Sequence, residues 1–153
     1  FGKALGCHGA AVLGSNQLTQ YLVNFARSFI YTTGLSPHSV ATIMVGYSQL
    51  ENDSESLGKL RSNIIYFNQQ KKLLGLTPLF VRSYSSIQCA IVQGNENVKN
   101  LAALFQENGF DVKAILSPTV PAGQERLRFC IHSYNSTEQI DAILNLLSAS
   151  IFK

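Results

Sequence analysis

The chain has 153 residues, of which 46% are hydrophobic and 14% charged, a composition that argues against a disordered or fibrous protein. The formal net charge of +3 comes from scattered basic residues, so no nucleic-acid partner is expected. The nearest approach to a basic cluster is Lys71 and Lys72, at the end of a predicted helix, where cations interact favourably with the helix dipole. No stretch reaches the roughly eighteen apolar residues that span a bilayer, so no membrane partner is expected.

The three cysteines, Cys7, Cys89 and Cys130, are odd in number and have no CxxC spacing. This predicts reduced thiols in a cytoplasmic protein, with neither a disulfide framework nor a metal site. No signal peptide is visible, and the first residue is Phe rather than Met. We therefore expect a cytoplasmic chain that has been truncated or processed.

The beginning of the chain predicts a glycine-rich loop, a short strand and two helices. The apolar run 10–13 is expected to be the strand, and Ser15 is a plausible N-cap for one helix that continues to about Ile30. Apolar residues recur at three- and four-residue steps along that helix, which predicts one buried face. Ser36 and Pro37 then open the second helix.

Residues 51–54 indicate a polar hinge before a long helix that ends at Gly75. After Gly75 the pattern alternates as strand, helix, strand, strand and helix, over residues 87–92, 95–108, 112–116, 126–132 and 137–151. This order predicts an α/β chain of the α+β kind, with two amphipathic helices on one face of a small, mainly antiparallel sheet. Residues 1–50 lack that rhythm and are expected to belong to a larger domain, with 51–75 as a connecting helix and 76–153 as a small domain.

A lone lysine, Lys3, lies among glycines and small residues near the start of the chain. Glycines let the backbone approach a bulky ring closely. A lysine that is kept from bulk water loses affinity for protons and becomes a nucleophile, which suits covalent attachment of a carbonyl cofactor. On local pattern alone, however, a surface lysine near a terminus is the more ordinary interpretation.

Lys3 begins a series of four short motifs whose order and spacing are informative. They are the glycine-rich run 2–10, the segment 25–33, the Ser-Ile-Gln run 86–88, and the Pro-Thr-Val-Pro-Ala-Gly turn with its Arg-Leu-Arg strand, 118–128. Together they resemble the α-oxoamine synthases, a family of pyridoxal-phosphate-dependent enzymes with the fold type I architecture. The resemblance covers the whole chain and implies the C-terminal part of such an enzyme, beginning at the cofactor lysine. Residues 1–50 would then be the remnant of the large cofactor-binding domain.

The resemblance implies roles for four residues. Lys3 corresponds to the lysine that carries pyridoxal 5'-phosphate and moves the α-proton of the substrate. Arg128 corresponds to the residue that binds the carboxylate of the amino acid, for which a planar guanidinium is well suited. Thr32 and Thr33 correspond to hydroxyl donors to the cofactor phosphate of the neighbouring subunit. The alternatives are a solvated sheet face for Arg128 and a helix-ending turn for the threonines.

The family condenses an amino acid with an acyl thioester and releases carbon dioxide. The sequences of residues 86–88 and 119–123 are most similar to those of the family member that joins L-alanine to pimeloyl-CoA or a pimeloyl-carrier protein in biotin biosynthesis. Glycine C-acetyltransferase is the main alternative within the family. The resemblance also implies a homodimer. Because most cofactor ligands of the family would precede residue 1, we expect this chain alone to be inactive.

A hypothesis of another class is a small α/β binding module without chemistry of its own. The strand and helix pattern after residue 75 fits both hypotheses equally, because a fold alone does not determine function. The ordered motifs from Lys3 to Arg128 favour the enzyme, since a binding module does not need them.

Overall fold

The structure is a computed structural model, and it describes residues 1–152. The chain divides into two compact units, Phe1–Ser54 and the part from Glu55 onward. In chain order the helices and strands are α1 (Asn16–Phe25), α2 (Arg27–Ile30), α3 (Pro37–Asn52), α4 (Ser54–Leu73), the 3-10 turn η1 (Thr77–Leu79), β1 (Ile87–Ile91), α5 (Asn95–Glu107), β2 (Lys113–Ile115), β3 (Arg126–Cys130) and α6 (Thr137–Ile151). None of these helices is both long and apolar enough to cross a bilayer, as far as the described residues go.

The helices of the first unit begin where the sequence predicts. The Ser15 hydroxyl accepts a hydrogen bond from Leu18 N at 3.2 Å and so caps α1. The Ser36 hydroxyl accepts from Ser39 N at 3.2 Å, and Pro37 occupies the first turn of α3. Both helix starts are therefore confirmed.

Two predictions for the first unit are wrong. The single helix to Ile30 is interrupted at Ala26, whose φ of −79° and ψ of 95° are extended and separate α1 from α2. No Gly or Pro marks this position, and the apolar spacing continues across it, so the sequence carries no local signal for the break. Residues 10–13 form no strand, because a strand needs a neighbour for its backbone hydrogen bonds and no described segment pairs with them.

The apolar face of the first helix, in a segment expected to belong to a larger domain, is exposed in this chain. Tyr21, Phe25 and Phe29 are 61%, 66% and 64% exposed, and α1, α2 and α3 contain no buried residue. Apolar spacing marks which face of a helix can be buried, but burial itself requires another element to cover that face.

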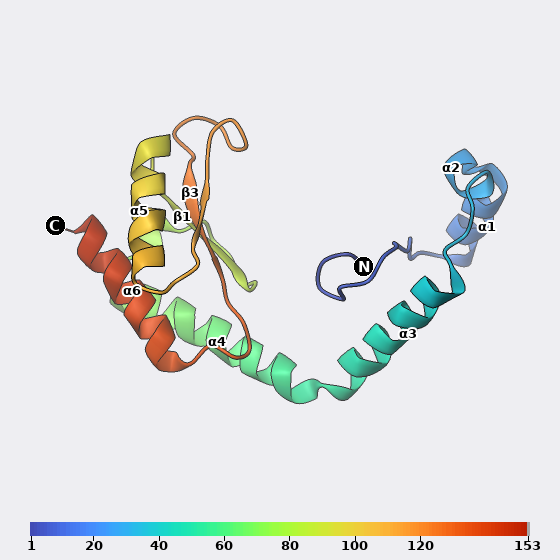
Figure 1. Cartoon of the computed structure of the whole chain (residues 1–153), viewed down its shortest axis with the longest axis horizontal. Coiled ribbons are helices and arrows are strands. Elements are labelled where there is room, and N and C mark those ends of the chain that lie inside the picture. Colours follow the sequence, from blue (N-terminus) through green and yellow to red (C-terminus); the bar gives the residue numbers. More distant parts are fainter. Residues whose placement is uncertain (153) are drawn as a thin grey trace. The chain divides into compact units, whose positions relative to one another are not determined.

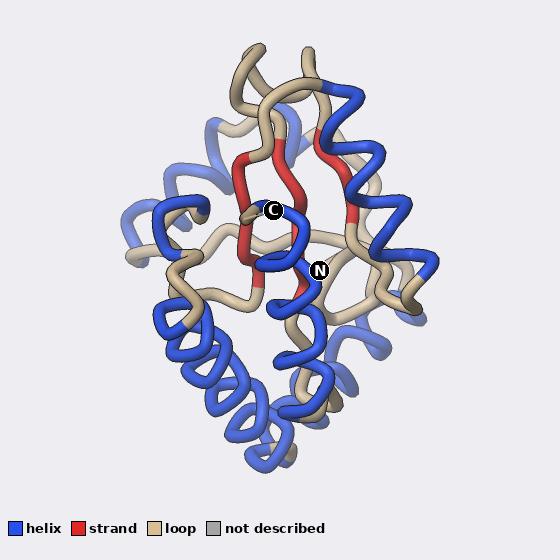
Figure 2. The backbone as a smooth tube through the Cα atoms, turned by 90° about the vertical axis from the view of Figure 1, so that its left-hand side faces the viewer, coloured by secondary structure: helices blue, strands red, loops and turns tan. Residues whose placement is uncertain are grey.

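The second unit contains the predicted small sheet (Figure 2). Its strand order is β1-β3-β2, and β3 pairs antiparallel with both neighbours. In this register Arg128 lies opposite Cys89 on β1 and opposite Lys113 on β2. The predicted order of strands and helices after residue 75 and the antiparallel sheet are both confirmed.

Aromatic side chains form the centre of the second unit. The Phe129 ring lies 5.7 to 6.1 Å from the rings of Phe67, Phe80 and Phe105, and all four side chains are buried. Helices α5 and α6 lie on one face of the sheet (Figure 1) and add Leu144 and other apolar side chains to the same core. Phe67 comes from α4, so the long helix contributes to this core as well.

The last helix begins with the capping box that the sequence predicts. The Ser136 hydroxyl accepts from Gln139 N at 3.3 Å, and the Gln139 side-chain oxygen accepts from Ser136 N at 3.1 Å. We expect Ser136→Ala to lower the free energy of unfolding by about 1 kcal/mol, because an N-terminal amide of α6 loses its acceptor. Urea titration followed by circular dichroism measures this, and Ser62→Ala, at an exposed site within α4, is the control that should cause no such loss.

Candidate functional site

Lys3 lies in a tight turn at the start of the first unit. Gly6 N donates to the Lys3 carbonyl at 3.1 Å, and Cys7 N donates to the Phe1 carbonyl at 3.2 Å. The Lys3 side chain is exposed and makes no hydrogen bond or ion pair with any described residue. Its amine is thus presented to solvent by a short closed loop.

Contacts with α3 hold this loop in place. The Cys7 thiol is 6% exposed and points at the carbonyls of Leu5, at 3.1 Å, and Thr42, at 3.6 Å. Gly9 has a φ of +122°, and a Cβ there would come within 2.9 Å of Leu35 Cδ1, so glycine is needed where the loop ends. The backbone conformation at Gly9 therefore gives a steric reason for a glycine in the first motif.

Thr32 and Thr33 follow α2 and are both exposed. The Thr32 hydroxyl donates to the Ser28 carbonyl at 2.6 Å, one turn earlier, so it helps to end that helix. The Thr32 hydroxyl oxygen can still accept a hydrogen bond, but its proton is already donated to the Ser28 carbonyl. A role in binding phosphate stays a prediction for both threonines.

Arg128 lies in the middle strand of the sheet in the second unit. Its neighbours Leu127 and Phe129 are buried on the helix-covered side, so Arg128 points to the open side, as strand alternation predicts. The Arg128 Nε atom is buried and has no hydrogen-bond partner among the described residues. By contrast, Arg126 Nε donates to the Gln124 carbonyl at 2.9 Å. Of these two strand arginines, Arg128 is the one whose Nε has no acceptor among the described residues.

Neither residue opposite Arg128, the cation Lys113 or the thiol Cys89, neutralises its charge. Cys89 faces Arg128 across the strands, and burial raises the pKa of the Cys89 thiol, while Arg126 and Arg128 lower it to a smaller extent. The thiol is therefore uncharged at neutral pH. A hollow of about 550 Å³ is lined by Arg128, Cys130 and His132 among others, which gives a carboxylate room to approach.

A buried carboxylate that the sequence does not single out supports the strand of Arg128. Glu125 is 3% exposed, and its Oε2 atom accepts hydrogen bonds from Gly94 N and Gly123 N, each at 3.0 Å. It thereby joins the turn 118–123 to the start of α5. The hydrogen bond from Gly94 is the largest cause that holds the pKa of Glu125 below its ordinary value.

This lowered pKa of Glu125 predicts an acid dependence of stability. The contribution is complete above the ordinary value of 4.5 and is lost as the pH falls through the lower pKa of the folded state. We expect the melting temperature to fall less steeply with acidification below that value in Glu125→Gln than in the unchanged chain. Glu107→Gln, which removes an exposed carboxylate at the end of α5, is the matched control and should keep the steeper dependence.

A buried cation has no signal in the sequence. Lys71, near the end of α4, is 5% exposed and donates to Asn68 Oδ1 at 2.7 Å and to Gln88 Oε1 at 3.2 Å. Its ammonium lies 4.8 Å from the centre of the Phe80 ring. Gln88 is fully buried and in turn donates to the Ser83 and Ser85 carbonyls at 3.2 and 2.9 Å. The cluster fixes the start of β1 against α4 and needs no ligand to satisfy it.

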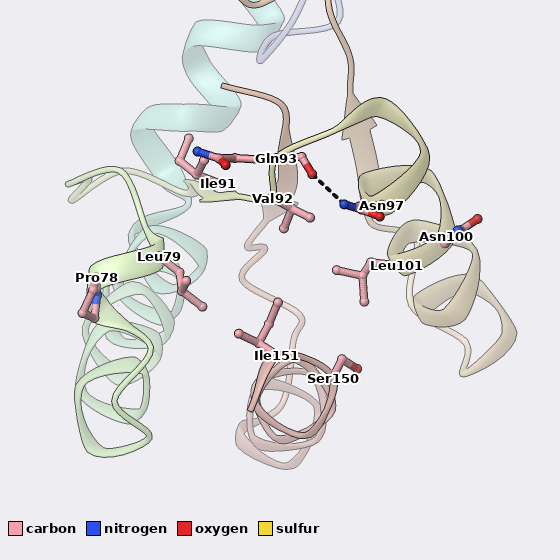
Figure 3. Close-up of a pocket in the computed structure, with 10 residues that line it drawn as sticks. All are labelled: Pro78, Leu79, Ile91, Val92, Gln93, Asn97, Asn100, Leu101, Ser150 and Ile151. Atoms are coloured by element: carbon pink, nitrogen blue, oxygen red, sulfur yellow. Dashed lines mark hydrogen bonds between the residues drawn. The ribbon is translucent and has the colours of Figure 1, made fainter. Parts of the chain in front are cut away.

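A second hollow of this unit has another character (Figure 3). Its volume is about 670 Å³, and no ionisable side chain is among its lining residues, Pro78, Leu79, Ile91, Val92, Gln93, Asn97, Asn100, Leu101, Ser150 and Ile151. Asn97 Nδ2 donates to the Gln93 carbonyl at 3.0 Å across its rim. Its one hydroxyl, that of Ser150, donates to the Leu146 carbonyl at 2.7 Å and has no lining acid or base beside it, so the lining gives no indication of a catalytic site. Within residues 1–152 there is also no group of His, Cys, Asp and Glu that could hold a metal ion.

Comparison with known proteins decides the family. The family model described as aminotransferase class I and II matches residues 1–147. The chain belongs to this family. Lys3, Thr32 and Thr33 lie in the first unit of this family member, and Arg128 lies in the second.

Relatives of this aminotransferase-family chain are 8-amino-7-oxononanoate synthases. The chain is 36% identical to that of Photorhabdus laumondii over 147 residues, which are 96% of this chain and 38% of the relative. It is 39% identical to that of Emericella nidulans over 157 aligned positions, covering 97% of this chain and 37% of the relative. The expected resemblance is confirmed. The chain thus spans less than two fifths of the length of these relatives.

Solved structures agree with this family fold. The crystal structure of 8-amino-7-oxononanoate synthase from Francisella tularensis superimposes with a TM-score of 0.81 at 31% identity, over 99% of this chain and 44% of that one. Serine palmitoyltransferase of Sphingomonas wittichii gives a TM-score of 0.77 at 23% identity, over 98% of this chain and 38% of that one, which shows the shared fold alone. The expected fold type I architecture is confirmed.

Proposed function

We propose that this chain is the C-terminal part of a pyridoxal-phosphate-dependent 8-amino-7-oxononanoate synthase, which joins L-alanine to a pimeloyl thioester and releases carbon dioxide. One observation carries the proposal: the relatives found along almost the whole chain bear this name at 34% to 39% identity. The motifs around Lys3 and Arg128 lie inside the matched region. The product belongs to biotin biosynthesis, and we place the enzyme in the cytoplasm.

The residues of the first unit fit pyridoxal 5'-phosphate. The Lys3 amine is exposed and has no partner among the described residues, so an aldehyde can reach it. The cofactor, when bound, supplies an electron sink for the carbanion of the amino acid. Lys3 then has two tasks: its amine holds the cofactor, and once released it removes and later returns the α-proton of the substrate.

Arg128 is the proposed carboxylate ligand. The buried Nε of Arg128 has no hydrogen-bond acceptor within the described part of the chain. A carboxylate can accept two parallel hydrogen bonds from such a guanidinium. The uncharged Cys89 thiol opposite leaves the positive charge of Arg128 available. Arg128 would thus bind and orient the carboxylate of L-alanine.

Thr32 and Thr33 are the proposed donors to the cofactor phosphate of a second subunit, which makes the enzyme a homodimer. For Thr32 this requires its hydroxyl proton to leave the Ser28 carbonyl. The exposed apolar side chains of α1 and α2 are compatible with burial in such an assembly.

The experiment is an assay of the intact enzyme with two substrate pairs. L-alanine with pimeloyl-CoA should release free coenzyme A much faster than glycine with acetyl-CoA, detected with a thiol reagent. Arg128→Lys should raise the KM for L-alanine about 10- to 100-fold, because a point charge replaces a bidentate ligand. Arg126→Lys is the matched control on the same strand face, since Arg126 already bonds to the Gln124 carbonyl.

Other outcomes identify the alternatives. A preference for glycine and acetyl-CoA would make the protein a glycine C-acetyltransferase, and no turnover with any amino acid and thioester would favour a non-catalytic module. The chain of residues 1–153 by itself is expected to show no turnover. It matches less than two fifths of the length of these relatives and so lacks the rest of the enzyme.

A further inference from the structure

A groove on α4 lies on a part of the second unit that the proposed function does not use. Its volume is about 470 Å³, and it is lined by Arg61, Ile64, Ile65, Asn68, Gln69, Lys72 and Tyr84. Ile65 is 58% exposed and Tyr84 is 74% exposed, although both are large and largely apolar. The groove therefore presents an uncovered apolar floor to solvent.

Two unpaired cations stand at the ends of this floor. Arg61 and Lys72 are exposed, and neither makes an ion pair or side-chain hydrogen bond with any described residue. No carboxylate is among the residues that line the groove. By contrast, Lys99 and Lys113, elsewhere on the second unit, are each paired with an acid, Glu96 and Asp111. The positive charge of the groove is thus not balanced within the described chain.

The spacing of the two cations matches the length of a short helix. Arg61 and Lys72 are about three helical turns apart on the same face of α4, which is roughly 16 Å along the axis. Ile65 and Asn68 lie between them on that face. A partner helix laid along this groove can place apolar side chains on Ile64 and Ile65 and carboxylates at both ends.

Tyr84 forms the opposite wall and is itself held in place. Arg82 donates from Nε and Nη2 to the Tyr84 hydroxyl at 3.2 and 2.9 Å, and its guanidinium lies 5.4 Å from the ring centre. The ring therefore presents an apolar surface, and Arg82 adds a third positive charge beside the groove.

We propose that the groove between α4 and Tyr84 binds an acidic amphipathic helix of a partner protein. The apolar floor supplies contact area. The two cations at its ends favour binding of a helix that carries carboxylates on both sides of its apolar stripe. This proposal does not depend on the proposed catalytic function.

The test uses a fluorescent synthetic peptide of about 18 residues, long enough to form a helix, with a leucine stripe flanked by glutamates. Fluorescence anisotropy with the full chain should give saturable binding that weakens as salt rises. The double change Arg61→Glu and Lys72→Glu should raise the dissociation constant about tenfold or more. Ile65→Ser should raise it as well, because the peptide loses contact with the apolar floor of the groove.

Matched controls separate the groove from general charge. Lys99→Glu with Lys113→Glu changes the net charge by the same amount at sites that do not line the groove, and should leave peptide binding within about twofold. A peptide with every glutamate replaced by glutamine should bind about tenfold more weakly to the unchanged chain. Circular dichroism melts of each variant check that the second unit stays folded, and Arg61→Gln with Lys72→Gln replaces the charge reversal if that variant does not fold.

Three results would overturn the proposal. If the peptide does not bind, or binds equally to the groove and control variants, the proposed helix-binding role of the groove is wrong. Binding to phosphatidylserine vesicles that is lost in the groove variant, without any peptide binding, would make the groove a membrane contact instead. Self-association of the chain that disappears in the groove variant, again without peptide binding, would make a second copy its occupant.

Discussion

Replacing Lys3 with alanine in the intact enzyme should abolish covalent attachment of pyridoxal 5'-phosphate. Turnover of L-alanine and pimeloyl-CoA should fall by about 10²- to 10⁴-fold, the usual contribution of a positioned acid-base group. The reason is that Lys3 presents a free amine from a loop whose Cys7 thiol donates to the Thr42 carbonyl of α3. Borohydride reduction followed by peptide mass mapping measures attachment, and release of coenzyme A measures turnover.

Lys99→Ala is the control for this experiment, because it removes an exposed lysine of the second unit that is paired only with Glu96. Its attachment and turnover should match those of the unchanged enzyme. If the reduced cofactor were found on another lysine, or if Lys3→Ala kept its label, the proposed role of Lys3 would be wrong.

The second unit could be predicted from sequence because its signals are local and mutually consistent. Alternation around Leu127 and Phe129 gives the strand and its buried side, and the Ser136 and Gln139 pair marks the start of α6. Each strand and helix also has its partners within the same unit, so the apolar faces that the pattern marks are in fact covered.

The first unit could be predicted only in part. Ser15 and Ser36 mark the helix starts correctly, because capping needs only the few residues that follow. The apolar run 10–13 and the face of α1 have no covering element or strand partner within the described residues, so patterns typical of burial give exposed residues here. Burial depends on what surrounds a segment, and a short sequence window does not contain that information.

The candidate site shows the same division. Strand alternation places Arg128 on the open face, but only the structure distinguishes it from Arg126, which is already bonded to the Gln124 carbonyl. The hydrogen bond that Glu125 accepts from Gly94 N, and the one that Lys71 donates to Gln88, join residues far apart in the sequence. No spacing rule links such residues, so these two buried charged groups could not be predicted.

The largest effect on stability should come from Phe129→Ala. The Phe129 side chain is 3% exposed and is surrounded by the rings of Phe67, Phe80 and Phe105 at 5.7 to 6.1 Å. Truncation removes these contacts and leaves a cavity beneath the strand of Arg128, which should lower the free energy of unfolding by about 3–5 kcal/mol. A typical domain has only about 5–15 kcal/mol in total, so the second unit should become marginally stable.

Urea titration followed by circular dichroism measures this loss, and hydrogen exchange of the β1 and β3 amides assigns it to the second unit. Phe29→Ala in the chain of residues 1–153 is the matched control: the same truncation at a residue that is 64% exposed in this chain should change the free energy of unfolding by no more than about 0.5 kcal/mol. Equal losses for the two variants would contradict the burial difference between the units. A loss confined to Phe129→Ala, together with faster exchange in β3, would mean that the ring cluster stabilises the strand that carries Arg128.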